Sequence, residues 1–143
     1  MTAHTELPTN APPVNNETQE FWDATARGVF LLKRCDDCGT VIWYPRFLCP
    51  DCHSTSTSWF EASGKGTVYS FTIPHRGQGP WREVAPFVVA YVELEEGPRI
   101  LTNLVDVEAT PEAITVGMPV EVVWHDTGEG SALYRFRPAA AAG

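Results

Sequence analysis

Four cysteines in two closely spaced pairs are the feature that most constrains how this chain folds. Cys35 and Cys38 form a Cys-x₂-Cys pair, and ten residues later Cys49 and Cys52 repeat the pattern. Each pair places two thiolates on a tight turn, and Gly39 directly after the first pair can adopt the backbone angle that such a turn needs. Four thiolates bind Zn²⁺ tetrahedrally and leave no position for water. The spacing therefore predicts one structural zinc ion, in a ribbon whose folding depends on the metal.

Other interpretations of the cysteines are less favoured. Four thiolates also suit iron, and His53, which follows the last cysteine, could replace a ligand, although we expect it on the surface beyond the turn. The first sixteen residues lack a charged start followed by an apolar stretch, so no secretory signal is expected. No apolar run approaches the roughly 20 residues that span a bilayer. These two observations predict that the chain lies in the reducing cytoplasm. In that compartment, paired cysteines indicate metal ligands more strongly than disulfides.

The charge of the chain argues against partners that carry a phosphate backbone. The chain has ten Lys and Arg residues and eighteen Asp and Glu residues, which gives a formal net charge of −8. Only two lysines are present, Lys33 and Lys65, and no basic cluster is visible. Because nucleic acids and anionic membranes bind clustered Lys and Arg, we expect neither as a partner.

The rest of the sequence predicts one helix followed by β-structure. Asn16 is the expected N-cap with Gln19 as its reciprocal partner, and Gly28 is a natural stop. The resulting helix, about 17–27, has an apolar stripe that must dock on this chain or on a partner. The expected strands are 29–34, 41–44, 58–62, 66–74, 86–94, 99–105, 119–125 and 132–137. The long strands predict a small closed β-barrel, with an open sandwich as the alternative.

These elements divide the chain into five predicted segments. We expect a flexible tail over 1–15, an N-terminal helix over 16–28, a zinc ribbon over 29–57, a barrel over 58–138 and a short tail over 139–143. The fold class that follows is mainly β.

No catalytic constellation stands out. The 64–67 segment (GKGT) lacks the earlier glycine of a phosphate loop and leads into a strand, so it is read as the bend where the barrel begins. His125 and Asp126 lie together at the end of a strand, where an ordinary surface position is expected. Trp43 and Tyr44 lie on the ribbon, where we interpret them as a cover for the metal.

The loop 74–83 is the segment outside the cysteines with the most chemistry. It gathers Arg76, Trp81 and Arg82 in an otherwise acidic chain. A solvated hairpin loop is one interpretation. The other is a contact surface, because exposed Trp and Arg are enriched at interfaces and guanidinium groups bind phosphates.

The ordered series of motifs resembles a known family. The motifs are FW (21–22), CDDCG (35–39), YPR (44–46), CPDC (49–52), GKGTVYSFT (64–72), PFVVA (86–90), GMPV (117–120) and FRP (136–138). Over 17–138 they resemble the acyl-CoA-associated zinc-ribbon proteins of the DUF35 family. The resemblance implies a rubredoxin-like zinc ribbon followed by a C-terminal OB-fold barrel.

The resemblance also implies a function. Proteins of this family accompany thiolase-like enzymes, among them thiolases, hydroxymethylglutaryl-CoA synthases, aldolases of lipid-transfer type that shorten steroid side chains, and acyltransferases of polyketide type; some are fused or bound to hydratases. It implies a cytoplasmic auxiliary subunit in a hetero-oligomer, with acyl-CoA as the substrate of the complex and the chemistry on the partner. In this hypothesis the helix and the ribbon pack on the partner, and the barrel mouth lies near the CoA tail.

Two other functions stay open at this point. An OB barrel also suits a single-stranded nucleic-acid-binding protein, which the acidic balance disfavours. A free-standing rubredoxin-like redox protein is the third hypothesis. Arg76, Trp81 and Arg82 are named as CoA or partner contacts from their chemistry alone, because the family varies in this loop.

Overall fold

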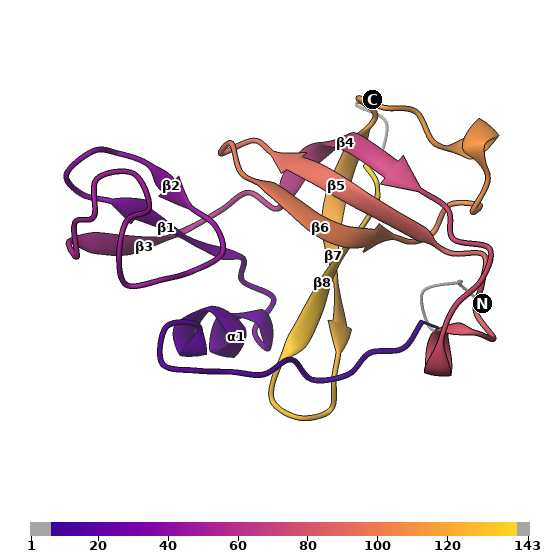
Figure 1. Cartoon of the computed structure of the whole chain (residues 1–143), viewed down its shortest axis with the longest axis horizontal. Coiled ribbons are helices and arrows are strands. Elements are labelled where there is room, and N and C mark those ends of the chain that lie inside the picture. Colours follow the sequence, from indigo (N-terminus) through magenta and orange to yellow (C-terminus); the bar gives the residue numbers. More distant parts are fainter. Residues whose placement is uncertain (1–6, 140–143) are drawn as a thin grey trace.

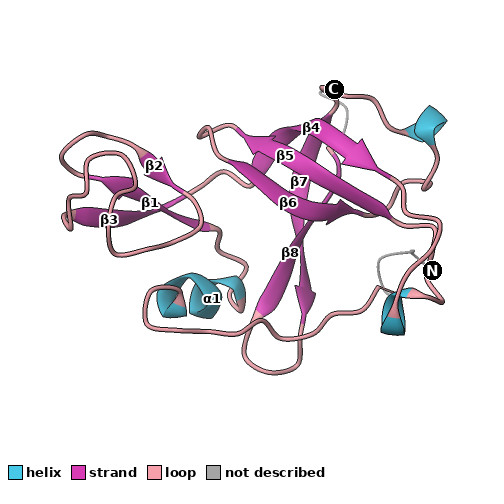
Figure 2. Ribbon diagram, viewed as in Figure 1, coloured by secondary structure: helices cyan, strands magenta, loops and turns pink. Residues whose placement is uncertain are grey.

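The structure, a computed structural model, describes residues 7–139. It consists of a short helix, a small three-stranded sheet and a closed five-stranded barrel (Figure 1). Strands dominate throughout, and the helical content is one α-helix with short 3-10 turns (Figure 2). The predicted mainly β fold is therefore confirmed, and the closed barrel excludes the open sandwich.

Helix α1 spans Gln19–Thr25 and is shorter than the helix predicted over 17–27. The predicted cap is wrong, because Thr18 occupies the N-cap position and makes no side-chain cap hydrogen bond. Asn15 organises the preceding turn instead, since its Oδ1 accepts hydrogen bonds from the backbone N–H groups of Glu17 and Thr18 at 3.0 and 3.1 Å. Gly28, at a φ of +71°, ends the helical segment as expected.

The ribbon sheet has the order β2-β1-β3, with β1 at Leu31–Cys35, β2 at Val41–Ile42 and β3 at Thr57–Glu61. All pairs are antiparallel. The third of these strands was predicted over 58–62 as part of the barrel, but it pairs along its whole length with β1, from Thr57 opposite Cys35 to Glu61 opposite Leu31. The ribbon is thus built from segments on both sides of the cysteine pairs.

The barrel closes in the order β4-β5-β6-β8-β7. Its strands are β4 (Lys65–Thr72), β5 (Val88–Leu94), β6 (Arg99–Leu104), β7 (Pro119–Asp126) and β8 (Ala132–Pro138). Two 3-10 helices interrupt the connections, η2 at Gly79–Trp81 and η3 at Pro111–Ala113. Antiparallel ladders join all neighbours except β6 and β8, which meet in parallel at one register pair, Leu104 and Phe136.

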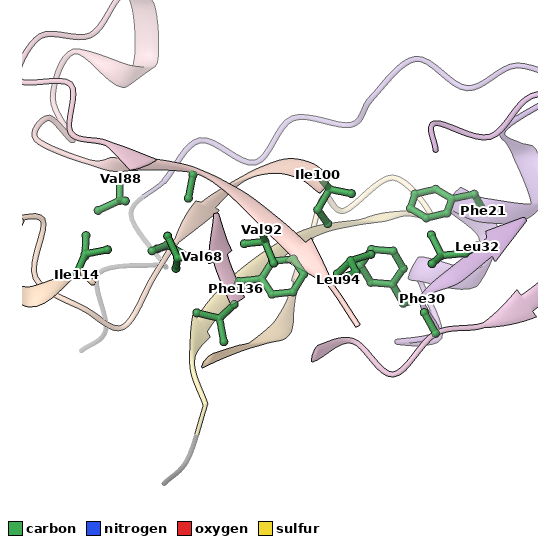
Figure 3. Packing of buried hydrophobic residues seen from close by; sticks show 14 of the residues in the cluster. Phe21, Phe30, Leu32, Val68, Val88, Val92, Leu94, Ile100, Ile114 and Phe136 are labelled. Carbon is green, nitrogen blue, oxygen red and sulfur yellow. The ribbon is translucent and has the colours of Figure 1, made fainter. Parts of the chain in front are cut away.

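One apolar core runs through all three parts. It extends from the barrel interior, where Val68 and Phe136 are buried, to Phe21 on the helix and Leu32 on the ribbon (Figure 3). The apolar stripe of the helix is thereby buried within this chain. Trp43 packs edge-on against Phe21 at 5.4 Å between ring centroids, so the predicted cover for the metal is wrong for this residue. It joins the ribbon to the helix.

Replacing Phe21 with alanine tests this joint. The side chain is fully buried, so the Phe21→Ala variant should lose about 3–5 kcal/mol of unfolding free energy. Urea denaturation followed by tryptophan fluorescence measures the loss. Val116→Ala is the control, since Val116 is 61% exposed and its replacement should change stability by less than about 0.5 kcal/mol. Equal stabilities of the two variants would contradict the packing described.

Candidate metal centre and barrel groove

The two cysteine pairs converge at the end of the ribbon sheet. Cys35 is the last residue of β1, and the other three cysteines follow on turns after β1 and β2. All four sulfur atoms lie within 4.8 Å of one another. The Sγ atoms of Cys35 and Cys52 are 3.5 Å apart, and those of Cys38 and Cys49 are 3.6 Å apart. The arrangement brings together the four residues that the sequence pointed to.

Each pair forms the same kind of turn. The N–H of Gly39 donates to the carbonyl of Cys35 at 2.9 Å, and the N–H of His53 donates to the carbonyl of Cys49 at 3.0 Å. Gly39 has a φ of +80° and His53 a φ of +65°. His53 therefore occupies the same left-handed position after the second pair that glycine occupies after the first. It lies outside the group of residues arranged to hold a metal ion.

The donor set fits a tetrathiolate metal ion. Four thiolates this close together repel one another unless a cation lies between them. Hydrogen bonds to the side chain and backbone of Thr40 lower the pKa of Cys38 to about 6. The hydrogen bond from the Ser54 backbone lowers the pKa of Cys52, but hydrogen bonds with the other cysteine sulfurs and desolvation outweigh it and raise that pKa to about 12. A bound metal ion would therefore be needed to keep all four sulfurs ionised together. Cys35 and Cys49 are buried, whereas Cys38 and Cys52 are exposed. When bound, the ion would be fully ligated by sulfur and would support the fold without taking part in a reaction.

Hydroxyl–carboxylate hydrogen bonds tie the two turns together. Thr40 donates to Asp51 at 2.7 Å, which links the first cysteine turn to the second. Ser54 donates to Asp37, and Ser58 on β3 donates to Asp36 at 2.8 Å. Sequence reasoning did not identify these pairs, because Asp, Ser and Thr in a polar loop have no distinctive spacing. The first two pairs fix the second turn against the first, and the third ties β3 to the first turn.

The 74–83 loop gives its three candidate residues different environments. Arg76 and Arg82 are exposed, whereas Trp81 is half-buried and packs on Phe87 with ring centroids 4.7 Å apart. Trp81 also borders a groove of about 440 Å³ that the two arginines do not line.

The groove lies between strands β6 and β8, beside the helix and the N-terminal segment. The residues around it are Pro8, Asn10, Pro12, Trp22, Tyr44, Trp81, Leu101, Thr102, Asn103, Leu133, Tyr134 and Arg135. It therefore collects side chains from every part of the fold. Tyr44, expected to cover the metal, is part of this wall, and its hydroxyl accepts a hydrogen bond from the indole N–H of Trp22 at 2.7 Å.

Arg135 and His125 form a buried polar pair beneath the N-terminal segment. Nη1 of Arg135 lies 2.8 Å from Nδ1 of His125, and both side chains are buried. The surface position expected for His125 is therefore wrong, because its strand turns the ring inward. Burial lowers the pKa of Arg135 to about 10, so the guanidinium stays charged at neutral pH. No sequence signal marked Arg135.

Comparison with known proteins places these features in a family. The model of the "ChsH2, rubredoxin-like zinc ribbon domain" matches residues 22–58, and that of the "ChsH2, C-terminal OB-fold domain" matches residues 59–125. The fold and the cysteine site thus define a zinc ribbon joined to an OB-fold barrel. A DUF35 domain-containing scaffold protein of Methanocaldococcus jannaschii is 38% identical over 73% of this chain and 78% of its own length. The chain belongs to the DUF35 family.

Two longer relatives carry hydratase names. A probable enoyl-CoA hydratase alpha subunit of Thermomonospora curvata is 38% identical over 90% of this chain. The 3-oxo-4,17-pregnadiene-20-carboxyl-CoA hydratase alpha subunit of Mycobacterium tuberculosis is 35% identical over 89% of it. In each case the match covers only 39% of the relative's length.

Two solved structures share the fold. A chain of the Ltp2-ChsH2(DUF35) aldolase superposes with a TM-score of 0.78 at 37% identity, over 91% of this chain and 100% of that one. A DUF35 protein from Sulfolobus solfataricus gives a TM-score of 0.64 at 15% identity, over 88% of this chain and 87% of that one. Within residues 7–139, no helix has the length and apolar character needed to cross a membrane.

Replacing a buried cysteine tests the metal centre. We expect the purified chain to carry one zinc ion, measured by plasma mass spectrometry, and the Cys49→Ser variant to lose it. In heteronuclear NMR spectra, amides of β1–β3 should then lose their dispersion while barrel amides keep theirs, because the ribbon relies on the metal. His53→Gly is the matched control and should keep the ion, since glycine suits the positive φ. Metal loss in this control, or full retention in Cys49→Ser, would contradict the assignment of ligands.

Proposed function

We propose that this chain is a non-catalytic auxiliary subunit of a thiolase-like enzyme of the lipid-transfer aldolase, thiolase or acyltransferase type. In this proposal it acts in the cytoplasm, in the breakdown of steroid or lipid side chains. It helps to form the acyl-CoA site, while the partner subunit supplies the reacting groups. The observation that carries the proposal is the match to the aldolase structure, which spans the whole of the matched chain at 37% identity. The hydratase names of the longer relatives support an acyl-CoA substrate.

The exposed part of the ribbon is the surface that best suits a protein partner. The helix was expected to pack on the partner together with the ribbon, but its apolar residues are buried within this chain. Tyr44, Phe47 and Leu48, here called the ribbon patch, are 38–53% exposed instead. Contiguous exposed apolar side chains are typical of interaction sites.

The ribbon patch is held in place before any partner binds. The N–H of Phe47 donates to the Glu17 carboxylate at 2.7 Å, which fixes the loop to the start of the helix. The ammonium group of Lys33 lies 5.4 Å from the centre of the Phe47 ring and 4.8 Å from that of Trp59. A pre-organised patch loses less conformational entropy on association than a mobile loop does.

The exposed arginines of the 74–83 loop suit the phosphate groups of CoA. Arg76 and Arg82 lie on the solvent side of a loop whose Trp81 reaches the groove. CoA needs only a local positive patch, so the net charge of −8 does not oppose this role. The proposal therefore keeps these residues as CoA contacts.

Co-purification tests the proposal directly. A tagged chain, expressed with the candidate thiolase-like subunit of its source organism, should retain that subunit, and acyl-CoA turnover should require both. Phe47→Asp should weaken retention at least tenfold, because a buried unpaired carboxylate opposes association. Val116→Asp, at a more exposed position, is the control and should assemble normally. Turnover of an acyl-CoA by the purified chain alone would overturn the proposal.

Loss of a metal ligand should act on assembly before activity. Cys35→Ser should unfold the ribbon patch and abolish complex formation, with turnover lost only as a consequence. Size-exclusion chromatography followed by an activity assay of the complex fraction separates the two effects. A fully assembled, zinc-free complex without activity would indicate that the metal has a role beyond folding.

A further inference from the structure

The groove between β6 and β8 has a roof that belongs to the same chain. Residues 7–13, here called the strap, run from beside η2 past β8 to the turn before α1 (Figure 1). Pro8, Asn10 and Pro12 border the groove, so alternate residues of the strap face it, as in an extended chain. A space of about 440 Å³ remains beneath the strap, which therefore lies on the groove without filling it.

The sequence of the strap (LPTNAPP) keeps it extended before it docks. Each of its three prolines has a fixed φ and disfavours helical backbone angles at the residue before it, which is Leu7, Ala11 or Pro12. A segment that is already extended loses little conformational entropy on binding. Because proline has no backbone N–H, the strap also offers more carbonyl acceptors than donors, and it suits a groove that supplies donors.

A buried guanidinium supplies the main donor. Nη2 of Arg135 donates to the carbonyl of Pro8, and Nη1 donates to Thr9 Oγ1 at 3.0 Å. Arg135 is only 2% exposed, and Nδ1 of His125 lies 2.8 Å from its Nη1. Hydrogen bonds from a charged donor are stronger than those between neutral groups. Arg135 is therefore the polar anchor of the strap.

The other walls of the groove are largely aromatic. Trp22 and Tyr134 stack with ring centroids 6.0 Å apart and an interplanar angle of 21°, and Tyr44 and Trp81 border the groove as well. Among the described residues around it, none is acidic and Arg135 alone is basic. Proline-rich segments dock in aromatic-lined grooves of this kind in several classes of peptide-binding domain. The lining therefore matches the composition of the strap that covers it.

Two further donors at the groove have no acceptor within residues 7–139. The hydroxyl of Tyr44 accepts a hydrogen bond from Trp22 at 2.7 Å and keeps its own proton to donate. The indole N–H of Trp81, a half-buried side chain, makes no hydrogen bond with the described part of the chain. The strap thus leaves part of the donor capacity of the groove unused, and a second carbonyl-rich segment can engage it.

We infer that the groove is a recognition site for an extended, proline-containing segment of another protein chain, and that the strap is its built-in competitor. The strap shows the chemistry of this ligand, namely prolines at positions 8 and 12, small uncharged residues between them and a carbonyl for Arg135. A segment in trans binds only where the strap has lifted, so its apparent affinity falls with the fraction of closed molecules. The inference does not depend on the proposed function.

Titration of the zinc-loaded, isotope-labelled full-length chain with the synthetic peptide LPTNAPPV, which copies residues 7–14, tests the inference by NMR. The double variant Pro8→Gly, Pro12→Gly should bind this peptide at least about fivefold more tightly than the wild-type chain does, because glycine raises the conformational entropy of the lifted strap. For the same reason, the peptide LGTNAGPV should bind the double variant at least about fivefold more weakly than LPTNAPPV.

The tryptophans of the chain report where the peptide binds. The indole N–H signals of Trp22 and Trp81 should shift on titration, because both residues border the groove. Those of Trp59 and Trp124, which lie outside it, should stay in place.

Two single variants separate the strap from general effects of substitution. Thr9→Val keeps all prolines but removes the hydrogen bond to Arg135, so it should also tighten peptide binding relative to the wild-type chain. Pro111→Gly, the matched control at an exposed position of η3, should bind the peptide as the wild-type chain does.

Equal binding of the two peptides by the folded double variant would overturn the inference, as would equal affinity of the wild-type chain and the double variant for LPTNAPPV. Shifts confined to Trp59 or Trp124 would also overturn it, as would absence of binding by a double variant whose barrel amides keep their wild-type dispersion. Concentration-dependent dimerisation of the wild-type chain in light scattering, without peptide binding to the monomeric double variant, would replace the inference by an exchange of straps between two copies.

Discussion

Contact between aromatic rings at the junction of helix, ribbon and barrel holds the three parts of this protein in one arrangement. The ring of Tyr134 on β8 lies 5.7–6.0 Å from the rings of Trp22 on the helix, Phe30 at the start of the ribbon and Trp43 directly after β2, measured between ring centroids. A ribbon of this size has little core of its own. Because the ribbon packs on the helix and the barrel, it extends the barrel core. Buried rings, instead of a flexible linker, then set the orientation of the ribbon patch.

The metal centre and the aromatic junction stabilise opposite ends of the same sheet. The thiols bring the two cysteine turns together at one end of β1, and Leu32 near the other end is fully buried in the common core. Carboxylate–hydroxyl pairs around the turns, such as Asp36 with Ser58, add local links. The partner binding proposed for the ribbon would thus depend on both ends of this sheet.

Local patterns predicted much of this structure. The cysteine spacing located the metal centre, and alternating apolar residues located all eight strands to within a few residues. The patterns could not decide which strands pair. Thr57–Glu61 alternates like a barrel strand, and only its ladder with β1 places it in the ribbon. The contact of His125 with Arg135 could not be predicted either, because a buried polar pair has no periodic sequence pattern. The groove escaped prediction for the same reason, since its walls come from residues as distant as Pro8 and Arg135.

The parallel contact between β6 and β8 has a mechanical consequence. Elsewhere the barrel strands are joined by ladders of three to seven register pairs, whereas this seam has one pair, Leu104 with Phe136. Few backbone hydrogen bonds therefore resist a local separation of these two strands, while the rest of the barrel stays tied. The seam is therefore the side of the barrel where separating two strands breaks the fewest backbone pairs.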